Sequence, residues 1–162
     1  LQAATEIAVD WWQKIRSYAN EFNRDHPRLF DQLLPSLRHI HSESDGLMDE
    51  VTMTIGLRLP PEFACKPFLE EVKKWAGEAT VHSYAYEPAH ADPRTSPVAR
   101  AFNLTWREAG QKPRYKLNTG TSDMNVVAPI WQCPIVAYGP GDSKLDHTPN
   151  EHIELAEYGK AI

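Results

Sequence analysis

The sequence predicts an α+β domain, a small sheet with two helices on one face, followed by an α/β fragment. Three observations support this prediction: an amphipathic run near the start, two extended runs around a short polar turn, and an abrupt change of composition. The change falls at residues 87–97, where three prolines occur without any apolar periodicity. We therefore divide the chain into residues 1–90 and residues 91–162.

The first part begins with a helix and a hairpin. Residues 3–22 predict an amphipathic helix because apolar side chains recur at three- and four-residue steps. The extended run 33–41 and the alternating run 51–58 flank the polar turn 42–46, which predicts a β-hairpin. The apolar stripe of the helix consists of Ile7, Trp11, Ile15, Tyr18 and Phe22.

A second helix and a third strand complete this part. Residues 64–76 carry an apolar face at helical spacing, and a glycine follows as a natural C-terminal stop. Residues 79–86 return to the composition of a strand. With the hairpin, these elements predict a sheet that carries both helices on one face.

The second part alternates helices with short apolar strands. We expect a helix from Val98 to about Gly110, a strand at 114–117 and a helix at 122–128. A buried strand at 134–138 and a helix that opens at Thr148 follow. This alternation is typical of an α/β sheet with helices packed on it.

Composition excludes some classes of protein. The net charge of −5, with acidic and basic residues interspersed, argues against a nucleic-acid-binding protein. No apolar run approaches the roughly 20 residues of a membrane span, and no secretory signal is recognisable, so we expect a cytoplasmic protein with two reduced cysteines. The first residue is Leu1 rather than methionine, which indicates a removed segment or a piece of a longer protein.

Two motifs have residue types suited to chemistry. His147 immediately precedes a capping box with proline at the first helical position, where an imidazole is held in a fixed direction. Such a residue suits a metal ligand or a catalytic base, or it is a loop histidine that bonds Asp146. In residues 119–123, TGTSD, free backbone N–H groups would bind a carboxylate, or Thr121 or Ser122 caps a helix.

The strings TGTSDMNVVAPIW and PIVAYGPGDSKLDHTPNEHI resemble the acetylornithine deacetylase, succinyl-diaminopimelate desuccinylase and carboxypeptidase G family. Within it, the likeness is to acetyl-lysine deacetylases, which also act on lysine or ornithine attached to a small carrier protein. The resemblance implies that His147 binds one of two bridged zinc (or cobalt) ions. It also implies substrate contacts from Thr121, Ser122, Asp123, Gly139 and Gly141, and from Arg58 in the run VTMTIGLRLPPE.

The same resemblance implies an organisation. Residues 1–90 would be a lid and dimerisation domain that pairs two copies, and residues 91–162 the C-terminal part of a zinc-peptidase-like catalytic domain. We recognise no counterpart of the family's upstream metal ligands, a His-x-Asp pair and a Glu-Glu pair, and the adjacent acids Glu70 and Glu71 fit a solvated helix face. We therefore expect a hydrolase of lysine or arginine biosynthesis whose 162 residues are inactive alone. The alternative is a non-catalytic dimerisation module. Lys116 is either solvated or faces an acidic carrier.

Overall fold

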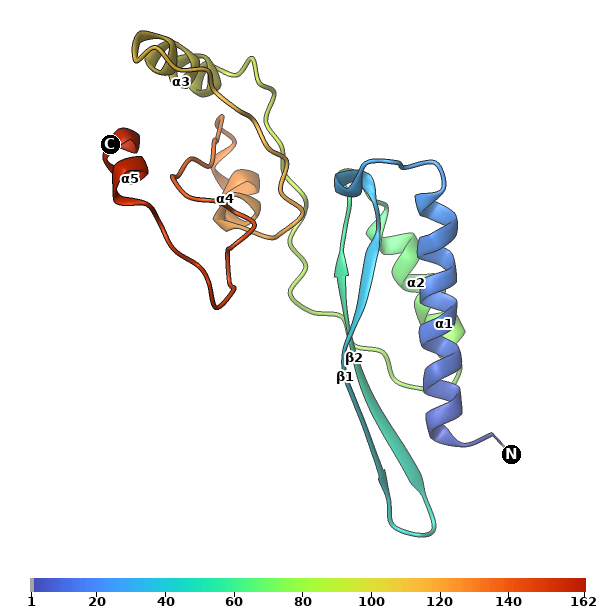
Figure 1. Ribbon diagram of the computed structural model, residues 1–162. Coiled ribbons are helices and arrows are strands. Elements are labelled where there is room, and N and C mark those ends of the chain that lie inside the picture. Colours follow the sequence, from blue (N-terminus) through green and yellow to red (C-terminus); the bar gives the residue numbers. More distant parts are fainter. Residues whose placement is uncertain (1) are drawn as a thin grey trace.

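A computed structural model describes residues 2–162. Figure 1 shows an N-terminal part of two helices and a hairpin, joined by a long segment to a C-terminal part of short helices and irregular chain. The elements in order are α1 (Ala4–Asn23), a 3-10 turn (Leu29–Asp31), β1 (Leu34–Ser44), β2 (Asp49–Arg58), α2 (Cys65–Ala76), α3 (Pro97–Glu108), α4 (Asp123–Trp131) and α5 (Leu155–Ala161).

The predicted hairpin is present, and its register places Arg58 at the base of the sheet. β1 and β2 pair antiparallel with Leu34 opposite Arg58, and a bulge interrupts the ladder between Leu37 and His39. The turn is fixed by Asp45, whose Oδ1 accepts hydrogen bonds from the backbone N–H groups of Leu47 and Met48 at 2.8 and 2.7 Å. This is the Asx geometry that favours aspartate at the start of a turn.

The core lies where α1 and α2 cover one face of the hairpin (Figure 1). The amphipathic stripe expected for residues 3–22 supplies the α1 side of it. The Nε1 of Trp11 donates to the carbonyl of Val72 at 2.9 Å and joins the two helices. The buried cluster comprises Ile15, Ala19, Leu33, Phe68 and Val72.

Three predicted strands are not formed, and these predictions were wrong. Residues 79–86, 114–117 and 134–138 have no strand assignment, and the sheet of the described residues contains β1 and β2 alone. A strand exists only where a neighbouring backbone accepts and donates its hydrogen bonds. Their apolar composition is suited to a sheet, but the described chain offers them no partner strand.

The C-terminal part is held by side-chain contacts around α3. The cap of α3 is Ser96, whose hydroxyl accepts the Ala99 N–H at 3.2 Å. The hydroxyl of Tyr115 donates to the Oδ1 of Asn103 at 2.8 Å, and the ring of Tyr138 lies 5.1 Å from that of Phe102. These contacts tie both irregular segments, 111–118 and 133–141, to one face of the helix.

The helix expected at Thr148 does not begin there. The Thr148 hydroxyl donates to the carbonyl of Leu145 at 2.7 Å instead of capping a helix. The carboxylate of Glu151 accepts the N–H of His147 at 2.8 Å, one residue earlier than a capping box requires. The result is a turn, and the last helix starts at Leu155.

Among the described residues, no helix combines the length and the apolar character that crossing a membrane requires. The two cysteines, Cys65 and Cys133, are both free.

Candidate functional site in the cleft between the two parts

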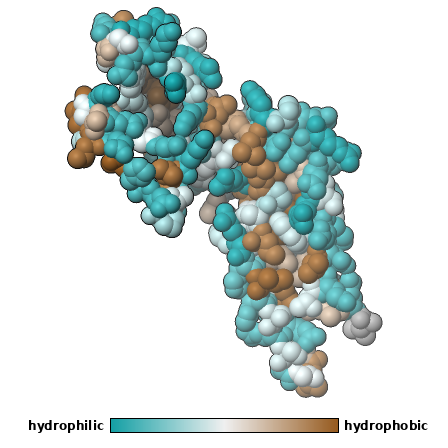
Figure 2. Space-filling view, in the orientation of Figure 1, coloured by the Kyte–Doolittle hydropathy of each residue, from teal (hydrophilic) through white to brown (hydrophobic). Residues whose placement is uncertain are grey.

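A large open cavity lies between the hairpin and the C-terminal part. Its volume is about 1990 Å³, above the roughly 300–1,000 Å³ of an ordinary small-molecule pocket. Its walls come from the base of the hairpin and from segments 81–94, 111–125 and 135–146. Figure 2 shows apolar groups gathered where the two parts meet, with polar groups around them. The cavity is therefore a wide cleft rather than an enclosed pocket.

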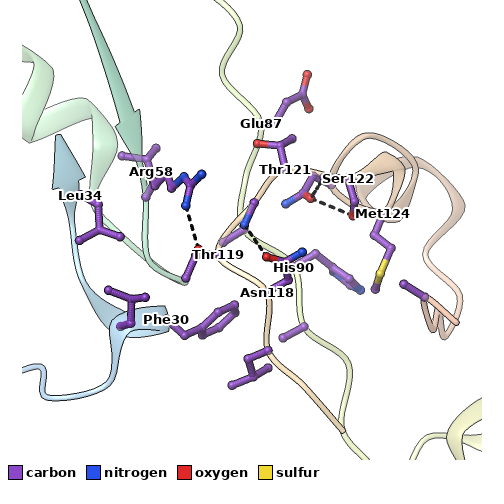
Figure 3. Close-up of a pocket in the computed structure, with 18 of the residues that line it drawn as sticks. Phe30, Leu34, Arg58, Glu87, His90, Asn118, Thr119, Thr121, Ser122 and Met124 are labelled. Atoms are coloured by element: carbon purple, nitrogen blue, oxygen red, sulfur yellow. Dashed lines mark hydrogen bonds between the residues drawn. The ribbon is translucent and has the colours of Figure 1, made fainter. Parts of the chain in front are cut away.

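Arg58 connects the hairpin to the TGTSD loop. As the last residue of β2, it is aimed out of the sheet, and its Nη1 donates to the Oγ1 of Thr119 at 3.0 Å. Figure 3 shows this bond at the centre of the cleft. The two residues are 61 positions apart, so the fold brings together a sheet arginine and a loop that the sequence analysis selected separately.

The TGTSD loop leads into α4, whose N-cap is Ser122. The Oδ1 of Asn125 accepts the Ser122 N–H at 2.9 Å, which satisfies a group that a helix start leaves free. Thr121 and Ser122 line the cleft, whereas Asp123, in the first turn of α4, does not. The structure thus groups two of the three predicted loop residues with Arg58.

The glycine-rich loop forms another part of the wall. Gly139 and Gly141 both line the cleft, and Gly141 has a φ of +99° that L side chains rarely adopt. Next to this loop, the Nζ of Lys116 donates to the Oγ of Ser143 at 3.2 Å and lies 3.8 Å from the Oδ1 of Asp142. Lys116 is therefore engaged within the chain.

His147 stands apart from the cleft lining. It is exposed, has a left-handed φ of 61° and does not line the cavity, although its neighbour Asp146 does. Within residues 2–162, no three His, Cys, Asp or Glu side chains are grouped to hold a metal ion. Since a zinc site takes three or four protein ligands, the described residues do not fit a metal centre by themselves.

The sequence analysis missed two residues of the cleft, His90 and Asp92. The Nε2 of His90 is buried and makes no hydrogen bond with the described residues, and it lies 3.4 Å from the Oδ1 of Asp92. The Oδ2 of Asp92 accepts the N–H of Ile135. His90-Ala91-Asp92 is an H-x-D pattern that the sequence analysis failed to recognise, and its proline-rich segment gives no sign of a contact with residue 135.

The charges on the lining are opposite in sign to those of the chain as a whole. Seven basic and four acidic residues line the cleft of a chain whose net charge is −5. This excess favours an anionic group such as a carboxylate. The basic residues are Arg38, Arg58, Lys66, Arg94, Lys112, Arg114 and Lys116, and the acidic ones are Glu87, Asp92, Asp146 and Glu157.

Comparison with known proteins agrees with the family suggested by these motifs. The sequence profile described as peptidase family M20/M25/M40 matches residues 11–162, almost the whole chain. The chain belongs to this family. The LysW-lysine hydrolase of Deinococcus radiodurans is 42% identical over 99% of this chain and 45% of its own length.

Two further relatives extend the comparison. A protein of Thermococcus kodakarensis is 36% identical over 98% of this chain and 41% of its own length. The LysW-lysine/LysW-ornithine hydrolase of Sulfurisphaera tokodaii is 39% identical over 44% of this chain and 20% of its own length. The chain thus spans less than half the length of the relatives it matches most fully. Their names specify removal of LysW, not of an acetyl group, which corrects the emphasis on acetyl-lysine deacetylases.

Proposed function

We propose that this chain is the lid and C-terminal catalytic part of a metal-dependent amide hydrolase. The enzyme releases lysine or ornithine from a small carrier protein in lysine or arginine biosynthesis. The observation that carries the proposal is the Arg58–Thr119 contact, at a cleft that also contains the glycine-rich loop. Membership of the M20/M25/M40 family and the names of the relatives support the reaction class.

The residues of this chain bind and orient the substrate. Arg58 presents a guanidinium group to the cleft, and such a group pairs with a carboxylate through two parallel hydrogen bonds. Thr121 and Ser122 add hydroxyl groups at the start of α4. Gly139 and Gly141 let the substrate backbone approach the loop closely. Together they favour an amino acid held by its carboxylate.

The metal part of the proposal rests on one residue. His147 is the one metal ligand that we expect in this chain, and a zinc or cobalt site would need two or three further protein ligands. When bound, such ions supply an activated water and polarise the amide carbonyl. Because this chain supplies one ligand, we predict no measurable hydrolysis by residues 1–162 alone.

The test is a hydrolysis assay on the protein at its full encoded length. The substrate is lysine linked to the carrier protein, with acetyl-lysine as the competing substrate, and free lysine is measured by mass spectrometry. We expect release from the carrier to exceed release from acetyl-lysine. Equal or greater activity on acetyl-lysine would contradict the carrier assignment, and no hydrolysis of either would contradict the enzymatic function.

The proposal includes a homodimer formed through the lid domain. Each strand of the two-stranded hairpin has one edge without a partner strand in the described residues, and free edges pair readily with another sheet. Sedimentation equilibrium of the full-length protein measures this directly. If the protein dimerises but never hydrolyses an amide, the alternative of a non-catalytic dimerisation module is the correct one.

A further inference from the structure

His90 is held in place on the wall of the cleft. The carbonyl of Pro88 accepts the Nδ2 of Asn125 at 2.7 Å, and the side chain of Asp92 accepts the N–H of Ile135. The segment 88–92 is therefore pinned on both sides of His90, once to α4 and once to the chain before the glycine-rich loop. Preorganisation of this kind is what a ligand-contacting side chain requires.

The two ring nitrogens of His90 have different surroundings. Nε2 is buried and faces the Oδ1 of Asp92 at 3.4 Å. A quarter of the side chain (26%) remains exposed, so another edge of the ring is open to the cleft that His90 lines (Figure 3). In a neutral imidazole one nitrogen donates and the other accepts a hydrogen bond, and we assign the proton to Nε2, the nitrogen nearer the Asp92 carboxylate. Nδ1 is then left as a hydrogen-bond acceptor.

Charged groups of both signs line the cleft on the side of His90. Glu87, Asp92 and Arg94 belong to the same segment as His90, and Arg58 stands on the hairpin side. Figure 3 shows Arg58 and His90 on opposite sides of Thr119, with Glu87 apart from His90. An amino acid with a second amine has a carboxylate that can pair with Arg58 and an ammonium group that can reach the wall formed by His90 and Asp92.

We propose that His90, positioned by Asp92, accepts a hydrogen bond at Nδ1 from the side-chain ammonium group of the amino acid. The Asp92 carboxylate supplies negative charge beside the ring. The subsite selects amino acids with an amine at the end of the side chain over those of equal length without one. The identity of the ligand as lysine or ornithine rests on the proposed function, whereas the binding of an ammonium group does not.

The first test is binding to the full-length protein. With ¹⁵N-labelled histidine, the ring nitrogens are followed by NMR as free lysine or norleucine, which lacks the ammonium group, is added. We expect a saturable shift of the His90 ring with lysine and none with norleucine. His90→Leu should weaken lysine binding at least about tenfold, because a hydrogen bond to a charged group is lost. His90→Gln should recover part of it through the amide oxygen.

His82, which lines the same cleft, provides a matched control. His82 lines the cleft but is exposed and contacts no carboxylate within 4 Å among the described residues, so His82→Gln should leave lysine binding unchanged. Asp92→Asn should weaken lysine binding while circular dichroism stays that of the wild type. In the hydrolysis assay, His90→Gln should raise KM for the lysine conjugate and leave kcat near its original value.

The two proposals fail separately. If the His90 ring does not respond to lysine, or if His90→Leu binds lysine as tightly as wild type, the ammonium subsite is wrong even when hydrolysis is observed. If lysine shifts the His90 ring signals, norleucine does not, and no amide is cleaved, the ammonium subsite is supported and the proposed enzymatic function is refuted. A shift of equal size with norleucine would overturn the selection for an amine.

Discussion

Replacing Asn23 with alanine should destabilise the N-terminal part more than any other substitution of an uncharged polar side chain in α1. The carboxamide of Asn23 pairs with both backbone groups of Leu33: its Nδ2 donates to the carbonyl at 2.9 Å, and its Oδ1 accepts the N–H at 2.8 Å. Leu33 is completely buried. The pair therefore fixes the chain that enters β1 to the end of α1.

The size of the destabilisation follows from the N–H and carbonyl of Leu33, which Asn23→Ala leaves without their partners. A buried backbone donor or acceptor without a partner costs about 1–3 kcal/mol. Asn23 is half-buried, so water can replace part of what its side chain provides. We expect Asn23→Ala to lower the free energy of unfolding by about 2–4 kcal/mol. Asn23→Asp keeps the acceptor but places an oxygen against the Leu33 carbonyl, so it should cost at least as much at neutral pH.

The assay is urea unfolding of the 162-residue chain, followed by the fluorescence of tryptophans that pack on the core, with Asn20→Ala as control. Asn20 lies on the same helix, is exposed and makes no side-chain hydrogen bond within the described residues. Hydrogen exchange of the Leu33 amide reports the local effect. If Asn23→Ala and Asn20→Ala unfold within about 0.5 kcal/mol of each other, and Leu33 stays protected, the reasoning is refuted.

Three further predictions concern the site and the hairpin turn. Thr119→Val keeps the shape but removes the acceptor of Arg58, and should lower kcat/KM of the full-length enzyme about 2–10-fold; unchanged kinetics would count against the contact. His147→Ala should reduce the metal content of the full-length protein by mass spectrometry, and an unchanged content would remove His147 from the metal site. Backbone hydrogen bonds from Met48 and Leu47 hold the pKa of Asp45 below its ordinary value, so its stabilisation of the turn is present above that ordinary value and is lost as pH falls through the lower folded pKa. Amide exchange at the turn should therefore speed up in acid, and an Asp45→Asn protein that kept the same acid dependence would contradict this.

Local patterns predicted the N-terminal part well. The alternation in 51–58 and the polar turn before it are enough for a hairpin, because the two strands are neighbours in sequence. The stripe through Ile15 predicted the buried face of α1 for a similar reason. In both cases the signal and the structure extend over the same short stretch of chain.

The wrong or missed predictions concern features that depend on residues far apart in the sequence. Whether 134–138 becomes a strand depends on a partner strand elsewhere, which periodicity does not reveal. The sequence pattern of a capping box is present at Thr148, but no helix begins there, because the Glu151 carboxylate accepts the N–H of His147 instead. The pairing of Asp92 with Ile135 spans 43 residues, so the H-x-D spacing at 90–92 does not by itself place His90 on the wall of the cleft.

The Arg58–Thr119 hydrogen bond links the N-terminal part of the chain to the C-terminal part. α1, α2 and the hairpin pack on one another, and α3, α4 and α5 make no comparable packing with them in the described residues. A connection of this kind permits relative movement by default. Since Arg58 ends β2 and Thr119 begins the loop that leads into α4, a movement of the hairpin changes the position of the loop hydroxyls directly. Thr119 holds only the Nη1 of Arg58, so a substrate carboxylate bound by the other N–H groups of the same guanidinium would couple occupancy of the cleft to the contact between the hairpin and the loop.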